Sequence, residues 1–232
     1  TVHKKWNENT AILSGDGMIV LAYQYLAQCN PSYLKQLLDL ANDTFIGITD
    51  GQQFDMDFET RNDVSELEYL EMIRLKTSIL LAACLKMGAI LGGASEEDAN
   101  LLYSFGEKLG LAFQLQDDLL DVYGDVKVFG KRIGGDIVCN KKTYMYINTC
   151  LLASDEERAI LAKWAQYEGD DVDAKIEAVK GVYDSVGIKG KAEAKIEELF
   201  NEAMSLLNKV SVLEEKKSVL REYALSLMNR VL

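Results

Sequence analysis

The sequence FQLQDDLLDVYG at residues 113–124 places three carboxylates, those of Asp117, Asp118 and Asp121, at the end of an otherwise apolar helix. Asp117 and Asp121 are four residues apart and share a helix face, where like charges repel. Gly124 is predicted to end the helix, so the negative end of the helix dipole adds to this repulsion. A divalent cation would relieve both effects, and Mg²⁺ commonly binds one or two carboxylates together with water and substrate phosphates. The stretch therefore predicts a magnesium-bridged phosphate site.

The alternative interpretation of such a cluster is a solvated acidic turn. Two features of the sequence argue against it. The apolar residues at 109–115 predict that the helix is largely buried, and buried carboxylates are rarely left unpaired. The sequence FGKRIGGDIVCNKKT at 129–143 then adds a glycine-rich segment with several cations, which suits a diphosphate held against bound metal. This segment lacks the G-x-x-x-x-G-K-[ST] order of a Walker loop, so it does not favour a nucleotide hydrolase.

The composition excludes several other classes of protein. A net charge of −12 disfavours nucleic acid and anionic membranes as partners. The longest apolar stretch, residues 79–85, is far shorter than the ~18 residues of a membrane span, so we expect a soluble protein without a transmembrane segment. The four cysteines form no close pair or metal-binding spacing, which predicts free thiols in a reducing, cytoplasmic compartment. His3 is the only histidine, which excludes a histidine triad within these residues.

Helical spacing and a single proline, Pro31, predict an all-helical chain forming one domain over residues 1–232. We expect helices over about 10–28 and 34–51, and a further helix after Ser65, with Glu68 as the capping partner of that serine. Another is expected to start at Ser95 and to lead to the carboxylate cluster.

Two other segments are candidates for a site. Residues 51–59 carry carboxylates with amide neighbours, and the surface and functional interpretations of this group are evenly balanced. Lys76 flanks the apolar side of the helix that follows Ser65. A lysine there more often extends to water, but Lys76 and Thr77 on an inward-facing helix can also meet a phosphate.

Taken in order, these segments resemble motifs of the polyprenyl (trans-isoprenyl) diphosphate synthases, the farnesyl and geranylgeranyl diphosphate synthase family. The resemblance spans nearly the whole chain. The family pattern F-Q-x-x-D-D-x-x-D is matched at 113–121, K-x-x-G-x-D-I-x-x-x-K at 131–141, G-Q-x-x-D at 51–55, and the lysine-threonine pair at 76–77. Several motifs in the same order are far more specific than any one of them.

The resemblance implies a fold, a reaction and a set of partners. The fold would be an all-α, isoprenoid-synthase-like helical bundle around a deep central cavity, assembled as a homodimer. The reaction would be the Mg²⁺-dependent head-to-tail condensation of isopentenyl diphosphate with dimethylallyl, geranyl or farnesyl diphosphate. Ionisation of the allylic diphosphate would give a carbocation, which a dry apolar cavity protects from water.

The resemblance also assigns roles to individual residues. The metal ligands would be Asp117, Asp118 and Asp121. The catalytic groups would be Lys76, Thr77, Gln114 and Asp117. The substrate would be bound by Lys76, Thr77, Gln114, Lys131, Lys141, Gln52 and Asp55.

One part of the family pattern has no match. A first aspartate-rich motif, followed by two arginines, would precede the position of Thr1. We therefore expect a truncated or processed chain that lacks its N-terminal helices and is inactive alone. Two alternatives remain open: a terpene cyclase of the same fold, and a non-catalytic regulatory subunit of a prenyl synthase.

Overall fold

The computed structural model describes residues 1–124 and 133–228, and its regular elements within these ranges are all helical. This confirms the predicted all-α fold class. The elements are α1 (Val2–Lys5), α2 (Glu8–Leu26), α3 (Pro31–Phe58), α4 (Glu66–Ile73), the π-helical turn η1 (Arg74–Ser78), α5 (Ile79–Leu91), α6 (Glu96–Tyr123), α8 (Gly135–Val138), α9 (Tyr144–Leu152), α10 (Asp155–Ala165), α11 (Val172–Ser185), α12 (Ile188–Lys209) and α13 (Glu214–Met228).

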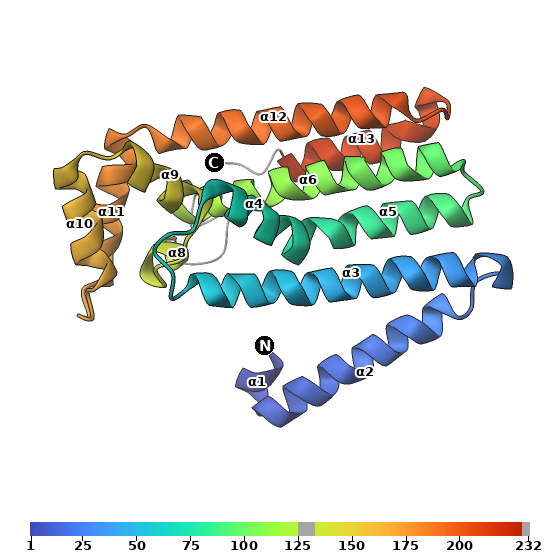
Figure 1. Cartoon of the computed structure of the whole chain (residues 1–232), viewed down its shortest axis with the longest axis horizontal. Coiled ribbons are helices and arrows are strands. Elements are labelled where there is room, and N and C mark those ends of the chain that lie inside the picture. The colour runs from blue at the N-terminus through green and yellow to red at the C-terminus, as the bar shows by residue number, and fades with distance from the viewer. Residues whose placement is uncertain (125–132, 229–232) are drawn as a thin grey trace.

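Helix α6 is the centre of the bundle (Figure 1). It packs against α5 on one side and α12 on the other, while α3 packs against α5 and η1. Close approach of α6 to its neighbours depends on small residues, since a Cβ atom at Gly106 would lie 2.8 Å from Ala82 Cα. The carboxylate cluster therefore lies on the most enclosed helix of the molecule.

The C-terminal end of α6 is surrounded by shorter helices. Helices α4, α8, α9 and α11 gather around this end, with α10 outside them (Figure 1). Their apolar side chains form one large core with those of α6, and this core includes Leu115, three residues before Asp118, and Leu119, directly after it. Asp118 is consequently carried into a nearly dry environment.

Helix α3 is longer than the sequence predicted. The expected helix over 34–51 begins at Pro31 and continues to Phe58, so Gln52 and Asp55 are helical. Gly51 does not end the helix. It lies against η1, where an added Cβ atom would be 2.5 Å from the backbone nitrogen of Lys76. This glycine serves close packing, not helix termination.

The helix boundaries marked by capping residues agree with the sequence. Ser65 and Glu68 form a reciprocal capping box at the start of α4, and the Ser95 side chain accepts a hydrogen bond from the backbone of Asp98 at the start of α6. Gly124 is the residue at which α6 ends. These caps satisfy backbone groups that the helix itself leaves unpaired.

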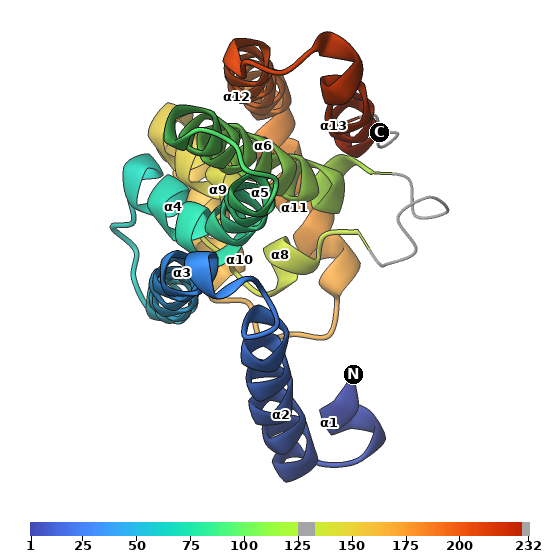
Figure 2. The same cartoon turned by 90° about the vertical axis from the view of Figure 1, so that its right-hand side faces the viewer.

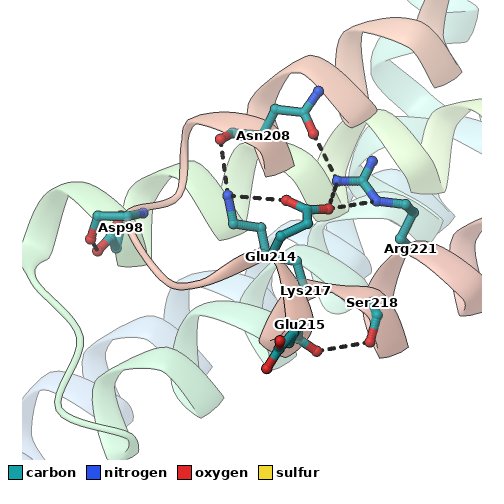
Figure 3. Close-up of polar contacts among 8 residues, drawn as sticks. Asp98, Asn208, Glu214, Glu215, Lys217, Ser218 and Arg221 are labelled. Carbon is teal, nitrogen blue, oxygen red and sulfur yellow. Dashed lines mark hydrogen bonds and ion pairs between the residues drawn. The ribbon is translucent and has the colours of Figure 1, made fainter.

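The turn between α12 and α13 is fastened by charged side chains (Figure 3). The Lys217 ammonium donates to the carbonyl of Asn208 at 3.0 Å, and Arg221 joins the Asn208 side chain to Glu214. Asp98 at the start of α6 accepts a hydrogen bond of 2.8 Å from the backbone nitrogen of Ser211. The C-terminal hairpin is thus tied to α6 at the end far from the carboxylate cluster.

Helix α2 stands apart from the bundle (Figure 2). It contains no buried residue, although it carries many large apolar side chains. Its main link to α3 is Tyr23, whose hydroxyl donates to Asn42 at 2.5 Å and whose ring meets Phe45 edge-on. None of the helices in the described ranges combines the length and apolarity needed to cross a membrane.

Candidate active site

A polar cavity of about 120 Å³ lies where α3, α4, η1 and α6 meet the segment around α8. It brings together residues from four sequence motifs that are far apart in the chain. Its walls are formed by Asp55, Phe58, Glu59, Tyr69, Met72, Ile73, Lys76, Gln114, Asp117, Asp118, Asp136, Lys141, Lys142 and Thr143. Carboxylates and lysines therefore face one another across a small space.

Lys76 is positioned by the π-helical turn η1. This turn interrupts what is otherwise one continuous helix over residues 66–91, and it directs Lys76 toward α3. The Lys76 ammonium lies 2.6 Å from the carboxylate of Asp55, and both side chains are partly exposed to the cavity. The pair gives the cavity a cation that is held in place without being sealed from solvent.

Thr77 and Gln114 form a hydrogen-bonded chain that leads to Asp118. The Thr77 hydroxyl donates to Gln114 Oε1 at 3.2 Å, and Gln114 Nε2 donates to Asp118 Oδ1 at 3.2 Å. The hydroxyl of Tyr69 donates to the other oxygen of Asp118. Both carboxylate oxygens of Asp118 are thus engaged by neutral donors.

Asp118 is the most strongly perturbed acid in the cavity. Burial raises its pKa to about 7, and the nearby charges of Asp136 and Asp117 act in the same direction, while the hydrogen bonds from Tyr69 and Gln114 lower it. Tyr69 is also buried, and its pKa lies well above the ordinary value for the same reason. The site therefore holds a carboxyl group whose charge is costly unless a cation comes close.

The three clustered aspartates do not occupy equivalent positions. Asp117 and Asp118 line the cavity, whereas Asp121 lies outside its lining and accepts a hydrogen bond of 2.9 Å from the backbone nitrogen of Asp136. Burial raises the pKa of Asp121. Within residues 1–124 and 133–228, no three histidine, cysteine or acidic side chains come close enough to hold a metal ion by themselves.

The cationic side of the cavity comes from the segment after α8. Lys141 lies 3.4 Å from Asp136. Burial lowers the pKa of Lys141, but the charges of Asp136, Asp55 and Asp118 outweigh this effect and raise it overall. Lys142 also lines the cavity, and its ammonium donates to the backbone carbonyl of Asn140 at 3.3 Å.

Most of the residues singled out in the sequence meet at this cavity. Asp55, Lys76, Gln114, Asp117, Asp118 and Lys141 line it, and Thr77 reaches it through Gln114. Gln52 is exposed on α3 and does not line the cavity. Lys131 lies outside the described residues. The ligand roles of all these residues remain predictions.

The structure adds residues that the sequence reasoning did not select. Tyr69 precedes Lys76 by seven residues, and this helical spacing was the available signal that the two side chains share a face. Asp136 and Lys142 belong to the cationic segment at 129–143, and the motif matched there includes Asp136 without giving it a role. Phe58 and Met72 add apolar walls that no polar motif could have revealed.

A second, apolar groove of about 410 Å³ lies further along the same helices. It is formed by α2, α3 and α5, and includes Leu37, Ala41, Leu80, Cys84 and Met87. On α5, Leu80, Cys84 and Met87 continue the helix face that begins with Lys76, because their spacing of three or four residues is that of a helix stripe. The groove and the polar cavity therefore share α3 as a common wall.

Comparison with known proteins gives consistent matches to one family. A model of the polyprenyl synthetase family matches residues 1–182. A geranylgeranyl diphosphate synthase of Methanosarcina mazei is 44% identical over 149 residues, which are 63% of this chain and 46% of the relative. A geranylfarnesyl diphosphate synthase of Natronomonas pharaonis is 36% identical over 188 residues, 80% of this chain and 53% of the relative.

Solved structures extend the likeness to the whole fold. A crystal structure of a geranylgeranyl pyrophosphate synthase superimposes with a TM-score of 0.93 at 40% identity, covering 100% of this chain and 72% of that one. A geranylgeranyl pyrophosphate synthetase from Pyrococcus horikoshii gives a TM-score of 0.91 at 29% identity, covering 99% and 70%. The chain spans about half the length of the first curated relatives that it matches.

Proposed function

The chain belongs to the polyprenyl synthetase family, and from this premise we propose that the complete protein elongates prenyl chains. It would condense isopentenyl diphosphate with an allylic diphosphate, giving a longer trans-polyprenyl diphosphate. The observation that carries the proposal is the polar cavity, in which lysines and carboxylates from the matched motifs face one another. Relatives named geranylgeranyl, geranylfarnesyl and farnesyl diphosphate synthase support the same reaction class.

The lysines of the cavity would bind the diphosphate of the allylic substrate. Lys76 of η1 and Lys141 of the segment after α8 both line the cavity, and Lys131, from the same motif as Lys141, would join them. In the free protein Asp55 and Asp136 hold these ammonium groups. A diphosphate would compete for them with charge-assisted hydrogen bonds, which are stronger than neutral ones. Gln52 would support the substrate from the rim of α3.

The carboxylates fit a hard divalent cation such as Mg²⁺. Asp118 has a raised pKa in the presence of Asp117 and Asp136, so a cation would relieve both burial and repulsion. We assign ligation to Asp117, with Asp118 and Asp121 in support, and Mg²⁺ would complete its shell with water and phosphate oxygens. When bound, the ion would draw negative charge onto the leaving diphosphate.

Thr77 and Gln114 would orient substrate at the reacting carbon. Their hydrogen-bonded chain ends on Asp118, which fixes the direction of the Gln114 amide. The free lone pairs of Gln114 Oε1 and of the Thr77 hydroxyl can turn toward positive charge that develops on the allylic group. Phe58, Met72 and Ile73 would limit the water that reaches the cation.

The apolar groove would take the hydrocarbon tail. It contains almost exclusively apolar side chains and follows a face of α5 that continues from Lys76 in η1. Met87 is 11 residues beyond Lys76, which corresponds to about 16 Å along a helix. A tail running along this face would meet Leu80 first and reach Met87 only after several isoprene units.

We also propose that the 232 residues belong to one synthase domain that acts as a cytoplasmic homodimer. The apolar side chains of α2 provide a surface for a second copy, since Leu13, Met18 and Tyr25 are each about 70% exposed. All four cysteines are free, which is consistent with a reducing compartment.

The direct test is product identification. The complete protein would be incubated with Mg²⁺, isopentenyl diphosphate and dimethylallyl, geranyl or farnesyl diphosphate, and the products analysed by mass spectrometry. Elongated prenyl diphosphates support the proposal. A cyclised hydrocarbon or alcohol formed without isopentenyl diphosphate would identify a terpene cyclase, and unchanged substrates would favour the regulatory subunit.

Variants sharpen this test. Asp117→Ala is expected to lower turnover well beyond about tenfold, a barrier change of roughly 1.4 kcal/mol. The matched control is Asp170→Ala, which removes an exposed carboxylate from the turn before α11. Turnover of Asp117→Ala within tenfold of the parent would contradict the role given to Asp117.

A further inference from the structure

Helix α11 carries a buried lysine that is not part of the polar cavity. Lys175 is only 5% exposed, and its ammonium donates to the carbonyl of Val138 at 3.1 Å and to Oδ1 of Asn140 at 2.8 Å. Buried ammonium groups are normally paired with acids. Among the described residues, however, Lys175 forms no ion pair with a carboxylate, and both of its partners lie at the end of α8.

Asn140 holds the chain in a conformation that this lysine stabilises. Its φ is +54°, the left-handed region that few residues other than glycine adopt readily. The Asn140 side chain uses both ends, since Oδ1 accepts from Lys175 and Nδ2 donates to the carbonyl of Ala165 on α10 at 2.9 Å. Its backbone carbonyl accepts from Lys142. The residue therefore links α10 and α11 to the start of the cationic segment.

The other end of α8 is held by the next residue of α11. Gly134 has a φ of +84°, and a Cβ atom there would lie 2.7 Å from Cδ1 of Ile176. On the opposite side, the Asp121 carbonyl accepts from the Gly134 backbone nitrogen at 2.6 Å. Lys175 and Ile176 thus contact the two ends of α8, while α6 binds its first turn through the Asp121 carbonyl.

We propose that Lys175 is a positioning residue for diphosphate binding, acting through the turn at 138–140 on Lys141 and Lys142. The inference rests on the proposed function of the polar cavity, because those two lysines are useful only if a polyanion binds there. Lys175 has three donors and satisfies a main-chain and a side-chain acceptor of the same turn. An apolar side chain of equal length would fill the space but leave both acceptors without this donor.

The geometry explains why Lys175 holds the turn through neutral acceptors and not through an ion pair with a carboxylate. Lys141 and Lys142 follow Asn140 directly, so a small rotation of this residue moves both ammonium groups. A carboxylate beside Lys175 would compete with the substrate for these lysines. Carbonyl and amide acceptors fix the turn without such competition, and they leave the positive charge of Lys175 behind the phosphate-binding segment.

The first experiment measures binding of inorganic pyrophosphate, with Mg²⁺, to the full-length protein by calorimetry. Lys175→Met is expected to raise the dissociation constant about tenfold, since small misplacement of binding groups has large effects. Lys163→Met, an exposed substitution on α10, is the matched control and should leave affinity unchanged. Asn140→Gly tolerates the positive φ and provides a second variant if Lys175→Met does not fold.

Epistasis with Lys141 separates positioning from general stability. In a Lys141→Met background, the further change Lys175→Met is expected to weaken binding by well under tenfold, because only its effect through Lys142 remains. Full additivity would overturn the inference, as would parental affinity in both Lys175→Met and Asn140→Gly. Failure of the unsubstituted protein to bind pyrophosphate would instead overturn the proposed function itself.

Steady-state kinetics give the corresponding signature. Lys175→Met and Asn140→Gly should each raise the KM for the allylic diphosphate more than they lower kcat. A uniform loss of kcat in both variants, with KM unchanged, would contradict the positioning role.

Discussion

At the scale of single residues, Asp118 shows how burial alters a carboxyl group. Its pKa is about 7, against 3.8 for an ordinary aspartate. Between these two pH values the folded protein keeps a proton that the unfolded chain has lost. The free energy of unfolding should therefore decrease as pH rises from about 4 to about 7, with respect to this group. Below about pH 4 the carboxyl group is protonated in both states, so its ionisation no longer changes the free energy of unfolding.

This sign leads to a prediction for Asp118→Asn. In this variant the free energy of unfolding should not fall between about pH 4 and pH 7 on account of residue 118. At pH 8 in the presence of EDTA, the variant should be more stable than the parent by about 1–3 kcal/mol. Urea unfolding followed by circular dichroism at pH 4.5, 6 and 8 measures it. Asp170→Asn, an exposed change, serves as the control. An unaltered pH dependence in Asp118→Asn would show that another group is responsible.

The sequence predicted the acidic and basic residues of the cavity better than their surroundings. Asp55, Lys76, Gln114, Asp117 and Lys141 could be selected because their motifs required charge or hydrogen bonding within apolar helices. The different environments of the three clustered aspartates could not be predicted. They depend on Tyr69 and on the backbone of Asp136, which approach α6 only after the chain has folded.

At the scale of helices, the contact between α3 and η1 depends on Gly51. A methyl group there would meet backbone atoms of Leu75 and Lys76 at 2.9 and 2.5 Å. Gly51→Ala should lower the free energy of unfolding by about 1–3 kcal/mol because backbone, unlike a flexible side chain, moves little. Urea unfolding measures the loss.

The control for this prediction is Gly181→Ala. Gly181 lies within α11, and nothing is found within 4 Å of the added methyl group. Alanine has the higher helix propensity, so this variant should gain up to about 1 kcal/mol. If both glycine variants changed stability equally, helix propensity would account for the data and close packing at Gly51 would not.

The apolar groove gives a second prediction at this scale. Cys84→Trp would fill part of the groove between α2, α3 and α5. If the prenyl tail extends there, the complete enzyme should release products at least one isoprene unit shorter than the parent's longest product. Mass spectrometry of the products measures the shift, and Cys84→Ser controls for loss of the thiol. An unchanged product distribution would place the tail elsewhere.

Helix locations were largely predictable, because capping residues and apolar spacing mark them in the sequence. The exceptions have a clear cause. Gly51 was taken to end a helix, since glycine commonly does so, but tertiary packing used it within α3. The π-helical turn at Arg74–Ser78 has no sequence signal of its own, because it depends on how the flanking helices pack.

At the scale of the whole molecule, α2 is the least integrated helix. Its apolar side chains, among them Leu13, Val20 and Tyr25, are mostly exposed. If they form the proposed dimer contact, Leu13→Glu with Val20→Glu should shift the protein toward monomer, because two charges would be buried without partners. Sedimentation velocity at several concentrations measures this shift.

Gln24→Glu is the control for that experiment, since it adds one negative charge to α2 at an exposed polar position. It should leave the oligomeric state unchanged. A parent protein that is monomeric at all concentrations, or a double variant that remains dimeric, would contradict the assignment of this surface. The all-α architecture was predictable from the sequence, but the separation of α2 was not, because its apolar spacing resembles that of a buried helix.

The π-helical turn also determines how the protein would respond to the deletion of a single codon. Residues 66–91 form one helical rod in which this turn accommodates a residue more than an α-helix would hold at the same place. In-frame loss of a single codon within 74–78 would leave an unbroken α-helix, with its two halves rotated by about 100° relative to the present arrangement. Tyr69 before the turn and the α5 residues Leu80 and Cys84 after it would then lose their present relative orientation. Shortening at this point should therefore preserve helicity while abolishing the site, whereas loss of a codon in the loop after α10 should be tolerated.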